Sequence, residues 1–148
     1  MEIQKLRAPE LPAAMDLCWR VFQELEAPDY PPEGVEAFHA YISNTEQVKH
    51  LTGFGAWEGR NLLGVLAAEG RHIALFFVDP AFHRRGIGRA LFQAYLAAGD
   101  WDRVTVHSSP CAVEVYRHLG FSPTAEEQRS PDGIRYTPMA WEPKTESE

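Results

Sequence analysis

One segment of the sequence combines groups that bind phosphate. It is the basic turn His83-Arg84-Arg85-Gly86-Ile87-Gly88-Arg89, which follows the apolar run Leu75–Val78 and the pair Asp79-Pro80. Pro80 removes a backbone donor and ends a strand, and the glycines allow the backbone to turn tightly where a helix begins. The first N–H groups of a helix have no partner within it and lie at the positive end of its dipole. Together with the arginines, these donors predict a binding site for a diphosphate.

A second segment places polar side chains on a short helix. It reads Ser109-Pro110-Cys111-Ala112-Val113-Glu114-Val115-Tyr116-Arg117-His118-Leu119-Gly120-Phe121. Ser109 and Pro110 predict the start of the helix, with Ser109 as its N-cap, and Gly120 predicts its end. Tyr116 falls on the apolar face of this helix, where a packed core phenol is the alternative to a chemical role.

The composition excludes several classes of protein. The chain has 148 residues, of which 45% are hydrophobic and 24% charged, with a formal net charge of −7. These values predict one globular domain over residues 1–142 and a polar tail at 143–148. The negative charge argues against a nucleic-acid partner and makes the arginine cluster a local anion site. Without a spanning apolar run or a signal-peptide core, we expect no membrane partner and a cytoplasmic location.

The cysteines and histidines do not suggest a metal centre. Cys18 and Cys111 lack Cys-x-x-Cys spacing, so we expect both to be reduced packing residues within helices. The histidines and carboxylates also lack the spacing of metal ligands, and we therefore expect no metal.

Alternating strand and helix patterns must position the two segments. Strand patterns occupy residues 2–7, two stretches of 54–68 joined by a turn at 58–61, 72–78, 104–106, 121–127 and 134–141. Helix patterns occupy residues 10–25, 33–43, the stretch after the glycine turn as far as residue 98, and 109–119. The almost continuously apolar strand 72–78 should be central and covered on both faces. Strands 72–78 and 104–106 should form a right-handed parallel crossover, and the last two strands a hairpin around Ser130-Pro131-Asp132-Gly133.

In spacing, the basic turn resembles motif A of the GNAT N-acetyltransferases, Q/R-x-x-G-x-G/A, with His83 in the first position. The segment from Ser109 to Phe121 resembles the second signature of that family, N-x-x-A-x-x-L/F-Y-x-x-x-G-F. The two motifs have the expected order and separation, and the resemblance covers roughly residues 50–141. It implies the mixed α/β (α+β) GNAT acyl-CoA N-acyltransferase fold, in which a mostly antiparallel sheet is split near Val78 and flanked by about four helices.

The resemblance also implies an activity: direct transfer of an acetyl group from the cosubstrate acetyl-CoA to a primary amine of a small molecule or peptide. In that family, backbone N–H groups after the central strand polarise the acetyl carbonyl, which points here to Phe77 and Val78. Tyr116 stands where many members place the general acid that protonates the leaving thiolate. The remaining cofactor-binding positions are His83, Arg84, Arg85, Gly86, Ile87, Gly88, Arg89, Ser109 and Ala112.

Three questions stay open at this stage. His72 is a possible base, but Glu69 precedes the same strand, Glu24, Glu26 or His107 could face the same cleft, and water could also remove the proton. The aromatic residues of the front half are either core or the acceptor pocket: Trp19, Phe22, Tyr30, Phe38 and Tyr41. The alternative function is a non-catalytic acyl-CoA sensor or partner-binding module, and the protein is a monomer or a homodimer.

Overall fold

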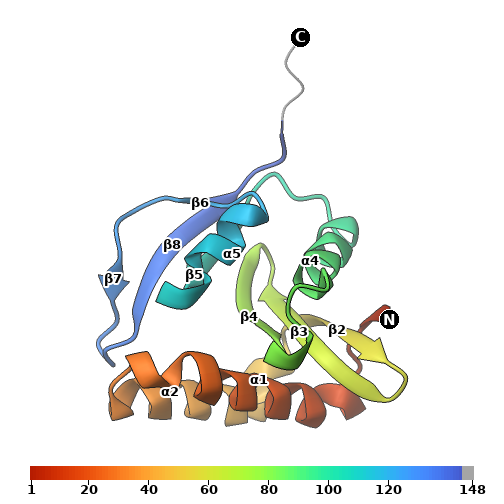
Figure 1. Ribbon diagram of the computed structural model, residues 1–148, viewed down its shortest axis with the longest axis horizontal. Helices are drawn as coiled ribbons and strands as arrows, with labels where there is room; N and C mark the ends of the chain where they lie inside the picture. The colour runs from red at the N-terminus through yellow and green to blue at the C-terminus, as the bar shows by residue number, and fades with distance from the viewer. Residues whose placement is uncertain (145–148) are drawn as a thin grey trace.

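A computed structural model describes residues 1–144 and shows a single mixed sheet with helices on both faces (Figure 1). The strands are β1 (Glu2–Lys5), β2 (Thr52–Glu58), β3 (Asn61–Glu69), β4 (His72–Val78), β5 (Val104–Ser108), β6 (Ser122–Pro123), β7 (Gln128–Arg129) and β8 (Arg135–Trp141). The helices are α1 (Leu11–Leu25), α2 (Pro32–Ser43), α3 (Thr45–Val48), α4 (Ile87–Ala97) and α5 (Val113–His118). Short 3-10 turns occupy Ala8–Glu10, Ala27–Asp29, Pro80–Phe82 and Pro110–Ala112.

The strand order is β1-β2-β3-β4-β5-β8-β6, and β7 also pairs with β8. Every pairing is antiparallel except that of β4 with β5. The expected mixed fold with a mostly antiparallel sheet is therefore confirmed. It has five α-helices in the described part of the chain, where about four were expected, because the single turn α3 follows α2.

Strand β4 lies between two hydrophobic cores. Its residues Ile73, Phe76 and Val78 pack with the core under α4 and α5, whereas Leu75 and Phe77 pack with the core under α1 and α2. Figure 1 shows these two pairs of helices on opposite sides of the sheet. A strand covered on both faces has to be apolar along its whole length, which explains the nearly continuous apolar pattern.

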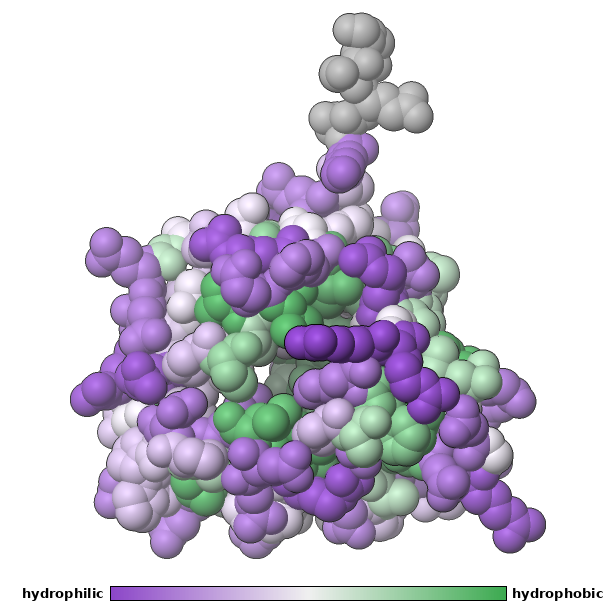
Figure 2. Space-filling view, viewed as in Figure 1, coloured by the Kyte–Doolittle hydropathy of each residue, from purple (hydrophilic) through white to green (hydrophobic). Residues whose placement is uncertain are grey.

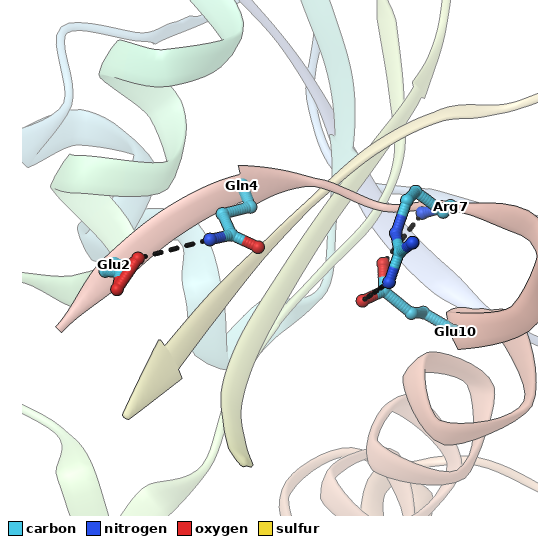
Figure 3. Close-up of polar contacts among 4 residues, drawn as sticks. All are labelled: Glu2, Gln4, Arg7 and Glu10. Carbon is cyan, nitrogen blue, oxygen red and sulfur yellow. Dashed lines mark hydrogen bonds and ion pairs between the residues drawn. The ribbon is translucent and has the colours of Figure 1, made fainter. Parts of the chain in front are cut away.

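A polar contact fixes the turn from β1 into α1 (Figure 3). The Glu10 carboxylate accepts the backbone N–H of Arg7 at 2.8 Å and its guanidinium at 3.4 Å. The backbone hydrogen bond is the main cause of a lowered pKa of Glu10. Nearby on β1, Gln4 donates to the Glu2 carboxylate at 3.2 Å. This turn directs α1 across the sheet, so that its last residues lie over β4.

The sheet opens between β4 and β5. These strands pair only at His72 with Thr105 and at Ile73 with Val106, and then separate. The split was expected near Val78 but begins directly after Ile73. The backbone of β4 beyond this point has lost one ladder partner, so its polar groups on that side can bind another molecule.

The end of the chain differs from its predicted pattern. Two short strands, β6 and β7, replace the single strand expected at 121–127, and both pair with β8. After β6 the Thr124 amide still donates to the Pro138 carbonyl at 2.9 Å, but Pro138 has no N–H group to return this bond, and the ladder ends there. The helix expected at 109–119 is divided into a 3-10 turn and α5. The predicted polar tail begins after β8, and its residues 145–148 lie outside the described residues.

Candidate functional site

The basic turn presents a row of free backbone donors. Gly86, at φ 76°, precedes the first turn of α4, and Arg84 also has a positive φ, of 67°. The first hydrogen bond that returns to this turn is donated by the amide of Ala90 to the Gly86 carbonyl at 3.0 Å. Within residues 1–144, none of the amides of residues 84–89 has an acceptor. All of these residues except Arg85 line a hollow of about 460 Å³ at the positive end of the α4 dipole, which is suited to an anion.

The three arginines of the turn do not act alike. Arg84 and Arg89 line the hollow, and Arg89 is held by a hydrogen bond from its Nη2 to the His118 carbonyl at 3.2 Å. Arg85 instead pairs with Glu58 at 3.2 Å. Its guanidinium lies 5.2 Å from the centre of the Phe82 ring. The Arg85 side chain is directed away from the hollow toward the tip of β2.

The other predicted residues of the turn contribute differently. His83, Gly86, Ile87 and Gly88 all line the hollow, but Ile87 is only 2% exposed as a whole residue, and its side chain packs into the core. Ile87 can therefore offer an anion only its backbone. His83 and Gly88 also line the next cavity along the sheet.

A narrow apolar channel leads from this hollow along β4. It has a volume of about 150 Å³, and its walls include Val21 and Leu25 of α1, Val78 of β4 and Val115 of α5. Leu25 is 37% exposed and Val115 is 55% exposed, which is unusual for residues of this size. Together with the other apolar walls of the channel, these two side chains offer a ligand apolar surface to cover.

The backbone of β4 faces this channel on one side. The Asp79 amide donates to the Leu63 carbonyl of β3 at 2.8 Å. Since successive residues of a strand direct their polar groups to opposite sides, the Phe77 amide faces β3 and the Val78 amide faces the split. Of the two amides predicted to polarise the acetyl carbonyl, the one of Val78 is directed toward the channel, whereas Phe77 contributes its ring.

The channel ends at a wider cavity of about 320 Å³ between the diverging strands. Its aromatic and apolar wall consists of Phe22, Tyr30, Phe38, Ile73, Ala74, Phe76, Phe77, Val106, Ala112, Ile134 and Tyr136. Its remaining lining residues are Glu26, His107, Ser109, Tyr116, Ser130 and Asp132. Figure 2 shows a hollow near the middle of the face seen in Figure 1, with apolar side chains around it.

Five residues line both the channel and the cavity: Glu26, Phe76, Phe77, Ala112 and Tyr116. Tyr116 is 6% exposed, and its ring packs edge-on against Phe76 and Phe121. Burial raises the pKa of Tyr116 well above its usual range, and the Glu26 carboxylate acts in the same direction. The phenol therefore stays protonated.

The Tyr116 hydroxyl differs from those of other core tyrosines. Tyr30 and Tyr95 donate to the carbonyls of Arg135 and Gly70 at 3.2 and 2.7 Å. Tyr116 has no such partner within residues 1–144, although buried phenols usually find one. Because it lines both spaces, its hydroxyl is available to a ligand at their junction.

Glu26 is the carboxylate at the junction. It follows the last turn of α1, and its amide donates to the Phe22 carbonyl at 2.9 Å. Burial raises the pKa of Glu26 to about 7, the nearby Ser109 hydroxyl opposes this shift, and Asp29 adds to it. One sequence signal distinguishes Glu26 from Glu24: position 26 continues the buried face of α1 through Cys18 and Phe22.

Two expectations about the segment from Ser109 onward need correction. Ser109 precedes a 3-10 turn, but its hydroxyl does not cap that turn. It lies 3.5 Å from the Cys111 Sγ and lines the cavity. Cys111 was expected to be a packing residue within a helix. It is exposed, belongs to the 3-10 turn and lines the channel, whereas Cys18 is fully buried in α1 as expected.

His72 is not among the residues that line the cavity or the channel. Its Nδ1 lies 2.9 Å from the Thr105 hydroxyl, and its ring lies edge-on to His107 at 4.9 Å. Burial lowers the pKa of His72, and His107 lowers it further. The structure therefore brings His107, but not His72, to the cavity wall.

Only part of the expected aromatic set reaches the cavity. Phe22, Tyr30 and Phe38 line it, whereas Trp19 and Tyr41 do not. Trp19 instead packs against His39, with the ring centroids 4.4 Å apart and the ring planes tilted by 38°. The proline-containing segment before α2 thus supplies the cavity with Tyr30.

Two kinds of feature are absent from residues 1–144. In that range no three histidine, cysteine, aspartate or glutamate side chains form a group able to hold a metal ion. No helix in the same range has the length and apolar character needed to cross a membrane.

Comparison with known proteins agrees with this geometry. Residues 26–143 match the family model described as acetyltransferase (GNAT) domain. No protein of curated function has a significant match to the sequence. A GCN5-related N-acetyltransferase from Rhodopseudomonas palustris has a TM-score of 0.81 at 18% identity, over 95% of this chain and 94% of that chain.

Two other solved structures have a similar fold. The PaiA N-acetyltransferase from Thermoplasma acidophilum, solved in complex with coenzyme A, has a TM-score of 0.72 at 15% identity, over 95% of this chain and 98% of that chain. Tetrahymena GCN5 has a TM-score of 0.68 at 13% identity, over 96% of each chain. These likenesses concern the fold, whereas the family match extends over most of the sequence. The chain therefore belongs to the GNAT acetyltransferase family.

Proposed function

We propose that this protein transfers the acetyl group of acetyl-CoA directly to a primary amine of a small molecule or peptide. The observation that carries the proposal is one continuous route through the molecule. It runs from the free amides at the start of α4, along the exposed backbone of β4, to a cavity with Tyr116 at its entrance. Such a route would place a thioester where a second substrate can reach it.

The residues along this route fit an acyl-CoA in charge and polarity. The amides of residues 84–89, with Arg84 and Arg89, suit a diphosphate. The exposed apolar side chains of Leu25 and Val115 suit the pantetheine arm, and the free polar groups of β4 can bind its amides. When bound, acetyl-CoA supplies the reactive thioester, and the protein supplies its orientation.

The junction provides two groups for the transfer. The neutral amine attacks the acetyl carbon, and the Val78 amide donates to the acetyl oxygen as negative charge develops there, an effect worth about 3 kcal/mol. As the C–N bond forms and the C–S bond breaks, the Tyr116 hydroxyl gives its proton to the sulfur. The phenolate then takes the proton that the new amide nitrogen loses. The raised pKa of Tyr116 keeps this donor protonated before the reaction.

The test is thiol release from acetyl-CoA in the presence of a panel of primary amines, with product identification by mass spectrometry. We expect amine-dependent release and an acetylated product. Coenzyme A binding measured by calorimetry gives the independent comparison. Binding without release above background for any amine would favour the non-catalytic acyl-CoA sensor, and absence of binding would overturn the cofactor site.

A further inference from the structure

We propose that Glu26 receives the ammonium group of the acceptor and takes its proton, and that the acceptor is an amine without a carboxylate beside its amino group. The proposal rests on the proposed acetyl transfer and names the class of its second substrate. It follows from the position of Glu26, from the charges of the cavity and from its apolar wall.

Of the two carboxylates that line the cavity within residues 1–144, Glu26 alone also lines the channel. Of the five residues shared by channel and cavity, Glu26 and Tyr116 alone have ionisable side chains. An amine that attacks a thioester must stand between the cavity, which holds its body, and the channel, which holds the thioester. His107 and Asp132 line the cavity without lining the channel, so they do not meet this requirement.

The surroundings of Glu26 leave its carboxylate without a cation. In the described part of the chain, the titratable side chains around it are Cys18, Asp29, Tyr30, Cys111 and Tyr116, and none of them is a positive partner. Ser109 contributes only a neutral hydroxyl. A half-buried carboxylate without a neighbouring cation favours an ammonium ligand, because the ligand then provides the missing charge.

The charges of the cavity select the class of amine. Its lining contains the carboxylates of Glu26 and Asp132 but no lysine or arginine from the described part of the chain. The carboxylate of an α-amino acid would find no positive partner there and would lie close to Glu26. The aromatic wall formed by Phe22, Tyr30 and Phe38 suits the apolar body of the amine and its positive charge.

The proton balance is complete with these groups. The acceptor enters as an ammonium ion, and one proton passes from its nitrogen to a Glu26 oxygen, which leaves a lone pair for attack. Glu26 later releases this proton to water through the open cavity. As the amide forms, the nitrogen loses a second proton, which replaces on the Tyr116 oxygen the proton given to the sulfur. The reaction therefore yields an amide, a thiol and one proton.

The first experiment compares amines with the amino acids that differ from them by one carboxylate beside the reacting amino group: phenethylamine with phenylalanine, histamine with histidine and agmatine with arginine. Thiol release and product masses are measured for wild-type protein. We expect at least one amine of these pairs to be acetylated and its amino acid to react at least tenfold more slowly. Equal or faster turnover of the amino acids would overturn the assignment of the acceptor class.

The second experiment tests Glu26 with the best amine of the first. Glu26→Gln should lower kcat/KM at pH 8 about 100-fold or more, the usual effect of losing a general base. Coenzyme A affinity should remain unchanged. In wild-type protein kcat/KM should rise with pH through a transition near 7, where Glu26 ionises, and this transition should be missing in the variant.

Matched variants separate this role from a structural one. Glu24→Gln, an exposed position on the same helix, should keep the wild-type pH profile. His72→Gln tests the competing base. A transition lost in His72→Gln but kept in Glu26→Gln would overturn the role of Glu26. Failure of wild-type protein to acetylate any amine would instead reject the proposed function itself.

Discussion

The Nε2 atom of His83 lies 2.9 Å from the carbonyl oxygen of Val78 and joins the basic turn to the end of β4. A carbonyl oxygen can only accept a hydrogen bond, so the Nε2 atom of His83 carries the hydrogen and donates it. Without this bond the turn loses its anchor to the strand that borders the channel. We expect His83→Ala to raise the KM for acetyl-CoA about 2- to 10-fold, the usual range for one hydrogen bond.

His83→Gln provides the control for this contact. Its side-chain amide can donate to the same carbonyl, so the KM should return close to the wild-type value. Steady-state kinetics with a fixed amine give both values. Equal effects of alanine and glutamine would mean that the imidazole itself, rather than the hydrogen bond, matters.

The two glycines of the turn should respond differently to alanine. Gly86 has φ 76°, so Gly86→Ala introduces strain of about 1–2 kcal/mol. Gly88 lies within α4, and an added Cβ would stand 3.6 Å from the Phe76 ring, an ordinary contact. Gly88→Ala should therefore keep or increase the free energy of unfolding, by up to about 1 kcal/mol.

For Gly88→Ala, coenzyme A binding should change in the opposite direction from stability: binding should weaken although the protein is as stable as before or more so. The added methyl group projects where hollow and channel meet, so we expect coenzyme A to bind at least tenfold more weakly to this stable protein. Urea denaturation and calorimetry measure the two effects separately. Unchanged coenzyme A affinity in Gly88→Ala would contradict the location of the cofactor site.

Tyr116→Phe tests the donor to the leaving sulfur. Because the hydroxyl has no protein partner within residues 1–144, its removal should change the free energy of unfolding by less than about 0.5 kcal/mol. The kcat should fall about 100-fold or more, with little change in the KM for acetyl-CoA. A rapid-mixing experiment that shows no initial burst of thiol release would confirm that the chemical step limits the rate of the variant. Wild-type turnover would assign Tyr116 to packing.

Glu26 should also affect stability as a function of pH. Its pKa is raised from 4.5 to about 7 in the folded protein, so the folded state binds the proton more tightly than the unfolded state. Stability due to this group is therefore greatest below pH 4.5 and falls as the pH rises toward 7. Between pH 4 and pH 8, this effect should cost the wild-type protein about 1–3 kcal/mol of unfolding free energy. The Glu26→Gln variant should not show this loss.

Urea titrations at several pH values measure this difference. Glu24→Gln, an exposed position, should follow the wild-type curve. A Glu26→Gln curve parallel to that of wild-type protein would show that the carboxylate is well solvated in the folded state.

Cys111 offers a chemical probe of the channel. It is exposed and lines the channel, whereas Cys18 is fully buried and burial raises its pKa. Iodoacetamide should therefore add one group, at Cys111, and saturating coenzyme A should slow this reaction severalfold. Peptide mass spectrometry locates the adduct, and Cys111→Ser should remain unmodified. Equal rates with and without coenzyme A would indicate that the ligand does not occupy the channel.

The sequence was most informative where local geometry decides the structure. The basic turn could be predicted because Pro80, Gly86 and the start of α4 act over a few neighbouring residues. The two-sided burial of β4 could also be predicted, since a strand that is apolar along its whole length needs cover on both faces. The parallel crossover from β4 to β5 followed from the order of elements.

Features that depend on distant partners could not be predicted in this way. The direction of the Arg85 side chain depends on Glu58, which lies on another strand. Glu26 could be named as a candidate, but its raised pKa depends mainly on burial in the folded protein, with smaller opposing effects of Ser109 and Asp29. The early separation of β4 and β5 likewise depends on how their flanking helices pack, which no local pattern records.

The hollow at α4 and the wide cavity share no lining residue, although the channel connects them. The hollow is built from residues 78–89 and 115–119, and the far end of the cavity from residues 22–38 and 130–136. Under the proposed function, substitutions in α2 and the last hairpin can therefore alter acceptor preference without touching the residues that would hold the diphosphate.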